Sequence, residues 1–146
     1  MDTTDDLNGL PVMVNPGLED DPLNKQGQSG TISFAELDKD NIYISFGKQM
    51  GLYASDALLV FRKSDDIYRD LMAGSRGIDT NDLKDLYRIG MLLDSKLPKD
   101  QRAAMNMAIA NPAIHERVFI SLEEQLGPRL NQGINPDDDV SVSRGR

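Results

Sequence analysis

His115 is the only histidine of the chain and the first residue to consider for catalysis. Glu116 and Glu123 lie within sequence reach, so a hydrolase could be built on this imidazole acting as a general base. However, no second histidine is present to complete a metal site, and a helix N-terminus disfavours a charged imidazole. A lone histidine on a helix more often packs or faces water, so we predict no catalytic residue.

Several short patterns begin like known motifs and fail at their remaining positions. The segment 38–41 opens like a calcium loop, but Tyr43 occupies the glycine position and Gln49 the position of the bidentate glutamate. The segment 45–48 fits Ser-x-x-Lys without the motifs that accompany it in serine hydrolases. Neither glycine-rich phosphate loop is present. We therefore predict no metal site and no cofactor.

Neighbouring carboxylates are the other residues that could do chemistry. A glycosidase needs two of them held in a cleft, in environments that separate their pKa values. The pairs in this chain fall on first turns of expected helices or on polar faces, where acids favour the helix dipole or face water. We interpret them as caps and solvated residues; they are Asp65 with Asp66, Asp82 with Asp85, and Glu123 with Glu124.

The helices that would position these side chains are clearest between residues 79 and 126. Asp79 or Thr80 can cap a first helix, because a short side-chain oxygen accepts from the free amides of the first turn. Pro98 cannot continue the hydrogen-bond ladder, so this helix should end at Leu97.

Two further helices should follow. One runs over residues 99–110, with Pro98 suited to its first turn. The next begins at Asn111-Pro112 and ends at Gly127, which fits a left-handed C-cap. Apolar residues recur at helical spacing along the block, and we expect the three helices to pack together with these side chains buried: Leu86, Leu93, Val118 and Leu122.

Upstream of this block the signals are shorter. Residues 33–36 match a capping box and predict a short helix. Residues 42–46 alternate like a strand, although the same residues could continue that helix. Ser55 can cap a helix running through Phe61, and residues 64–66 carry a second cap signal, so one kinked helix or two short ones should end at Gly74.

Residues 1–30 are rich in proline and glycine, and we expect an extended arm without regular structure. A short apolar island lies within it. The island could dock on a partner protein or on the chain's own core, or be a chance cluster in a flexible tail. We take it, with a methionine pair further along, as the tentative partner-binding set: Leu10, Val12, Met13, Val14, Met105 and Met107.

The charge of the chain is concentrated at its beginning. The formal net charge is −8, yet residues 31–136 carry fifteen acids and thirteen bases and are nearly neutral. A basic patch that could hold nucleic acid is therefore not expected. The absence of cysteine excludes disulfides and thiolate chemistry. No apolar run is long enough to span a membrane, and the acidic start is unlike a signal peptide, so we expect synthesis in the cytoplasm.

Taken together, these patterns predict a mainly α fold of four to five helices with a short strand near 42–46. Residues 1–30 would be an extended acidic arm, 31–130 the helical domain and 131–146 a polar C-terminal tail. We expect a non-enzymatic structural or adaptor subunit of a larger protein assembly, such as a virion or a secretion machine. Its partners would be other protein subunits or further copies of itself, bound through the helical face and the arm. An acidic regulator that occupies a basic site on another protein is the alternative.

Overall fold

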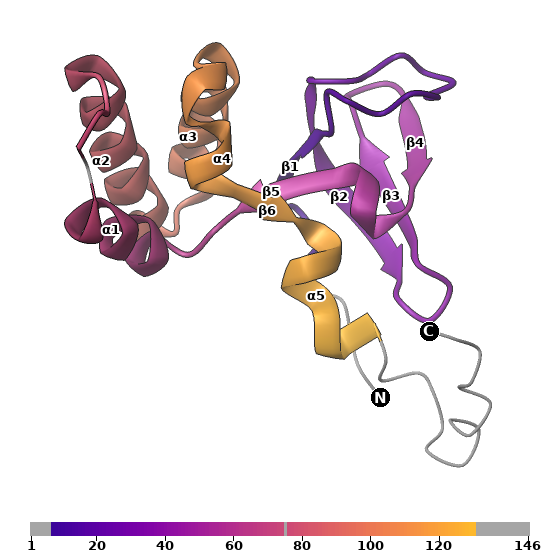
Figure 1. The fold of residues 1–146 in the computed structure, drawn as a ribbon. Coiled ribbons are helices and arrows are strands. Elements are labelled where there is room, and N and C mark those ends of the chain that lie inside the picture. The colour runs from indigo at the N-terminus through magenta and orange to yellow at the C-terminus, as the bar shows by residue number, and fades with distance from the viewer. Residues whose placement is uncertain (1–6, 75, 131–146) are drawn as a thin grey trace.

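The fold is mixed α and β, and the expectation of a mainly α domain is wrong. The computed structural model describes residues 7–74 and 76–130. Within them, six strands form one antiparallel sheet, and a group of helices lies on one side of it (Figure 1). The expected C-terminal tail, 131–146, lies outside the described residues. No helix in the described part of the chain is long and apolar enough to cross a bilayer.

The strands are β1 (Pro11–Val14), β2 (Ser29–Glu36), β3 (Asn41–Ser45), β4 (Met50–Tyr53), β5 (Leu58–Phe61) and β6 (Phe119–Ser121). The α-helices are α1 (Ser64–Ala73), α2 (Thr80–Ser95), α3 (Pro98–Ala110), α4 (His115–Val118) and α5 (Leu122–Leu130). Two short 3-10 helices, η1 (Ser55–Ala57) and η2 (Pro112–Ile114), complete the described elements.

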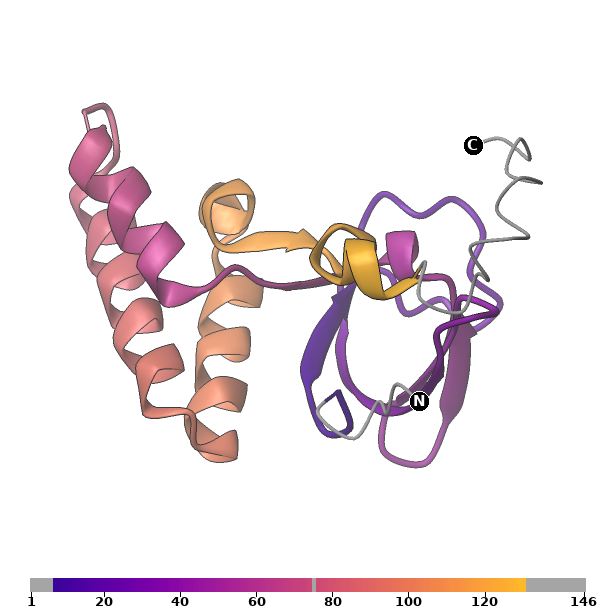
Figure 2. The same ribbon diagram turned by 90° about the horizontal axis from the view of Figure 1, so that it is seen from below.

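The sheet has the order β4-β3-β2-β1-β5-β6, and it curls strongly (Figure 2). Strands β3 and β4 are joined by a two-residue loop closed by the bond from the Phe46 amide to the Gln49 carbonyl, 2.8 Å. Gly47 takes a φ of 89° at the first loop position, a value that suits glycine and the tight turns that join antiparallel strands. Strands β4 and β6 are the two edges of the sheet, whereas β1 lies in its interior.

Strand β1 separates two apolar cores, because successive side chains of a strand point to opposite faces. Val12 and Val14 belong to the sheet core, the cluster on the concave side that also holds Ile32, Ile44 and Leu122. Met13 points the other way, into the helical core. Strand β5 divides its residues in the same manner: its first and third side chains join the sheet core, and its second and fourth pack against the helical core.

The two faces of the sheet are covered by different elements. The helical core lies between the convex side of β1, β5 and β6 and helices α1 to α4, and its buried members include Met13, Ile67, Leu86, Ile89, Met105 and Phe119. Helix α3 lies next to β1, and α1 and α2 lie farther from the sheet (Figure 2). On the concave side, Leu122 and Leu126 of α5 close the sheet core. The chain thus has two separate interiors on the two sides of one sheet.

The helices around Pro98 follow the prediction closely. The Asp79 side chain caps α2 by accepting from the Asn81 amide at 3.0 Å. Helix α2 ends at Ser95, two residues before the expected end, where Lys96 takes a left-handed conformation. Pro98 occupies the first turn of α3, which runs to Ala110 as expected. Helix α1 begins at Ser64 and is followed by Gly74, so its expected bounds are confirmed, but Ser64 lies inside the helix and no side chain caps it.

The third helix of the block, by contrast, does not exist as one element. The chain between residues 112 and 130 forms η2, α4, β6 and α5 in succession. Phe119 belongs to the helical core and Ile120 packs against the sheet core, which requires an extended backbone between them. Helix α5 therefore leaves the other helices and closes the concave side, and Gly127 lies inside it rather than at its end.

Two further helix signals upstream are also wrong. The capping-box residues 33–36 lie in β2, where Ala35 is buried and the register shifts between Ile32 and Phe34. The helix expected from Ser55 to Phe61 is one 3-10 turn followed by β5. The strand expected near 42–46 is confirmed. Strand β3 spans Asn41–Ser45, and its Ile42 and Ile44 side chains are fully buried. Pairing with neighbouring strands outweighs local helix preferences at these positions.

Residues 7–30, expected to be part of a separate arm, belong to the folded unit. Their apolar island forms β1, which pairs with both β2 and β5. The loop between β1 and β2 is tied down by Asp21, whose carboxylate accepts from the amides of Leu23 and Lys25 and from the Tyr53 hydroxyl, each at 2.9 Å. Burial alone would raise the pKa of Asp21, but these hydrogen bonds outweigh it and hold the pKa below its ordinary value.

Candidate functional site

The tentative partner-binding residues lie mainly inside the molecule and do not form one surface. Val12, Met13 and Val14 are fully buried in the two cores, and Leu10 packs half-buried against the sheet core. Met105 is buried in the helical core, and Met107 packs against it. In this structure the six residues therefore serve the interior, because the central strand of a sheet and the inner face of α3 need apolar side chains on the covered sides.

The imidazole ring of His115 packs against neighbouring residues of the helical core. Its Nε2 atom lies 2.6 Å from the Ala108 carbonyl oxygen, and its ring meets Phe119 edge-on with centroids 5.4 Å apart. Neither Glu116 nor Glu123 is among its hydrogen-bond partners in the described residues. Across residues 7–74 and 76–130, no group of three or more histidine and acidic side chains is placed to hold a metal ion.

The side chains that stand out are instead exposed apolar residues on the outer side of α1 and α2. Met72 on α1 is 84% exposed and Met91 on α2 is 61% exposed, while Tyr87 is half-exposed. Large apolar side chains gathered on one surface are typical of contact sites for other proteins. We call this surface the helical face; its members are Tyr68, Met72, Tyr87 and Met91.

The two tyrosines form the centre of the helical face. Their rings are stacked with centroids 6.0 Å apart, across the junction of α1 and α2. Tyr68 can lie so close to α2 because the residue beneath it is Gly90. A Cβ atom at that position would stand 2.6 Å from the Tyr68 ring. Helices α1 and α2 run in opposite directions, so Met72 extends the face toward the loop that joins them and Met91 extends it toward the other end.

A polar rim borders the apolar centre. The Tyr68 hydroxyl donates to Asp94 at 3.4 Å, and the Ser64 hydroxyl donates to the same carboxylate. Partial burial raises the pKa of Tyr68, and the negative charge of Asp94 raises it further. Asp65 and Arg69 line a shallow hollow beside Tyr68 and Met72. An apolar centre with a mixed charged rim is the usual anatomy of a protein interface.

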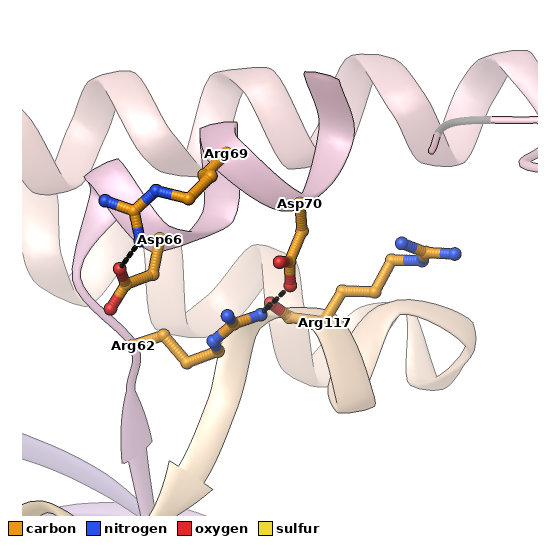
Figure 3. Close-up of polar contacts among 5 residues, drawn as sticks. All are labelled: Arg62, Asp66, Arg69, Asp70 and Arg117. Carbon is orange, nitrogen blue, oxygen red and sulfur yellow. Dashed lines mark hydrogen bonds and ion pairs between the residues drawn. The ribbon is translucent and has the colours of Figure 1, made fainter. Parts of the chain in front are cut away.

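Helix α1 is fixed to the rest of the molecule by an arginine at the end of β5. The Arg62 guanidinium donates to Asp70 at 2.5 Å and to the Arg117 carbonyl at 3.0 Å, so it joins β5, α1 and α4 (Figure 3). The hydrogen bond from Arg62 holds the pKa of Asp70 below its ordinary value. On the exposed side of the helix, Arg69 pairs with Asp66 at 2.8 Å (Figure 3). The helical face is thus displayed on a firmly positioned helix.

Sequence reasoning expected a helical surface to bind partners but did not identify the four residues that form it, although a signal was present. Ile67 and Leu71 of α1 and Leu86 and Ile89 of α2 mark the buried stripes. At 100° per residue, Met72 and Met91 fall well outside those stripes, so their apolar character is not explained by the core.

Comparison with known proteins adds no further assignment. The chain matches no protein-family model, no curated protein and no solved structure.

Proposed function

We propose that this chain is a non-enzymatic protein-binding module, an adaptor or structural subunit of a larger protein assembly. Its partner would bind on the helical face. The observation that carries the proposal is the exposure of Met72 and Met91 on either side of the stacked pair Tyr68 and Tyr87. Such a surface leaves apolar area in water, which a partner would remove.

The composition of the helical face suits a binding anchor. Tyrosine and methionine are enriched in protein interfaces, and tyrosine is among the residues that dominate binding energy. A fully buried apolar side chain contributes roughly 1.5–3 kcal/mol, so two methionines and two partly buried tyrosines can support a specific contact. The tyrosines are already held in place by stacking, which reduces the entropy that binding must overcome.

The binding role on the helical face does not depend on where the chain works or on whether it is an enzyme. That the chain works in the cytoplasm or within a large particle stays a prediction, as does the expectation that it is not an enzyme. The helical face supports the binding role by its chemistry, and the role can be tested without knowing the partner.

Photo-crosslinking from the helical face is the experiment that tests this proposal. A photoreactive amino acid would replace Met72 in the full chain, produced in the cells that normally make it. We expect one discrete crosslinked partner, and we expect Met91→Glu to abolish that adduct in the same chain. The matched control places the photoreactive residue at Lys99, an exposed position on α3. Absence of an adduct at position 72, or the same adducts at 72 and 99, would refute the proposal.

A further inference from the structure

Strand β4 has a free edge. It is the terminal strand of the sheet, and hydrogen-bonded pairs alternate with non-bonded pairs in an antiparallel ladder. The bond from Phe46 to Gln49 fixes this alternation, so Gly51 and Tyr53 bond to Ile44 and Ile42 of β3. The amides and carbonyls of Met50 and Leu52 therefore point away from the sheet. Among the described residues no backbone group bonds to that side of them.

The side chains of this edge are apolar and exposed. Met50 and Leu52 are each 55% exposed. Leu52 also ends a row across the outer face of three strands, where it stands opposite Tyr43, which in turn stands opposite Phe34. Proteins commonly protect an edge strand with charge, proline or a covering segment. Here the middle of β4 has an apolar surface and unpaired backbone groups together, which is the combination that adds a further strand.

The charges at the two ends of β4 show which strand would fit. Lys48 lies in the turn before β4 and Asp56 follows its end; both are exposed, and neither forms an ion pair with another described residue. A second β4 placed antiparallel would bring its own Asp56 to the Lys48 end, and its own Lys48 to the Asp56 end. The edge is therefore complementary to itself under a two-fold axis, as a symmetric dimer requires.

We propose that a second copy of this chain pairs with β4, so that two sheets join into one across a two-fold axis at Gly51. In this register Met50 stands opposite Leu52 of the second copy, and Leu52 opposite its Met50. The outward backbone groups of both residues then form four hydrogen bonds across the axis. The contact is small, so the dimer is weak and depends on concentration.

The proposed dimer does not depend on the proposed function of the helical face. Strand β4 lies at the far side of the sheet from α1 and α2 (Figure 1). Pairing through β4 would leave both helical faces free and turn one binding site into two on a single particle. Two linked sites bind an assembly with repeated partners more tightly than one site does.

Sedimentation of the full chain measures the dimer directly. The monomer has a mass of 16.2 kDa, and we expect the weight-average mass to rise toward twice that value from low micromolar to near-millimolar concentration. Leu52→Lys places two like charges within the paired edge and should leave the chain monomeric throughout. Phe34→Lys is the matched control, because this exposed residue lies two strands away from the edge and should leave the dimer intact. Circular dichroism would verify that both variants fold.

Charge reversal tests the symmetry. Lys48→Asp alone, or Asp56→Lys alone, should raise the dissociation constant about tenfold, because each makes both terminal contacts repulsive. The double variant should restore it, since the opposite charges meet again with their signs exchanged.

Amide hydrogen exchange locates the contact. The amides of Met50 and Leu52 should become slower at high concentration, while those of Gly51 and Tyr53 should be slow at every concentration. The proposal is overturned by a chain that stays monomeric, by a dimer that survives Leu52→Lys, or by concentration-dependent protection that lies elsewhere. Met72→Glu should leave sedimentation unchanged, so failure of the dimer and failure of the helical face are distinguishable.

Discussion

The outer face of the sheet is covered in one half and bare in the other. Over β1, β5 and β6 its side chains, among them Met13 and Phe119, pack into the helical core. Over β2, β3 and β4 the outward positions hold mostly serine, threonine, asparagine or glutamate, and the apolar side chains among them, such as Phe34 and Leu52, are half-exposed or more. Strand pattern alone therefore does not determine burial: whether an apolar position is core or surface depends on which helices the chain places over it.

The difference between the covered and the bare half of the sheet separates interior from exposed surface. The covered half is part of the interior and fixes the helices, whereas the β4 edge and the helical face expose large apolar side chains to water. Substitutions in the covered and the bare half should differ most in their effect on stability, and smaller effects are expected at single positions elsewhere in the fold.

Replacing Met13 by Ala should lower the free energy of unfolding by about 2–5 kcal/mol, because a fully buried side chain leaves a cavity in the helical core. The same truncation of Phe34, on the bare half, should change it by less than about 0.5 kcal/mol. Denaturant unfolding of both variants measures the difference. Equal losses would show that the two halves are not distinct.

Gly30→Ala should destabilise the chain by about 1–3 kcal/mol. A Cβ atom there would stand 2.6 Å from Ile44 Cγ2 and 2.7 Å from the Ser45 carbonyl oxygen, so β2 and β3 would have to separate. Gly17→Ala is the control, because its Cβ would meet only Asn15, at an ordinary 3.4 Å. Thermal unfolding that does not distinguish the two variants would refute the close approach of these strands.

Asp21→Asn should cost about 1–2 kcal/mol near neutral pH, because the amide group cannot replace all three hydrogen bonds that the carboxylate accepts. Since folding lowers the pKa of Asp21, its contribution is present above the ordinary value of 3.8 and is lost as pH falls through the folded-state pKa. The stability difference between wild type and variant should therefore shrink under acid. Asp20→Asn, at an exposed position, should show neither effect.

Gly127→Ala should stabilise the chain by at most about 0.5–1 kcal/mol, because the residue lies within α5 and, its chain neighbours and the backbone of α5 aside, no described atom lies within 4 Å of an added Cβ. The proline that follows limits the gain, since it disfavours a helical residue with a Cβ atom before it. A left-handed C-cap at this position, as the sequence alone suggests, would instead make alanine destabilising. The sign of the change in melting temperature decides between the two.

Elements with local chemical signals could be predicted from the sequence. Helices α2 and α3 have a capping aspartate, Asp79, and a first-turn proline, Pro98, and these act within a few residues of themselves. Among the strands, β3 was indicated by the alternation of residues 42–46, but the others carry no comparable signal, because a strand is stabilised by partners far along the chain. The capping-box pattern at 33–36 is an instance: its residues pair with β3 instead.

The two surfaces were harder to predict than the elements. The apolar run at 11–14 suggested a peg for a partner, but β1 is buried because both of its faces are covered. For the helical face a local signal exists, because helical periodicity places Met72 and Met91 outside the buried stripes. The exposure of the β4 edge follows from the position of β4 at the end of the sheet, which no local pattern contains.

Residue-resolved hydrogen exchange of dilute, monomeric chain tests the central claim most directly, namely that 11–14 is the strand between two cores. The alternating ladder directs the amides of Val12 and Val14 to β2 and that of Met13 to β5. We expect all three to exchange as slowly as the most protected helix amides, while Met50 and Leu52 on the free edge exchange fast. Exchange of Val12, Met13 and Val14 at the rate of an unfolded chain would contradict the fold described above.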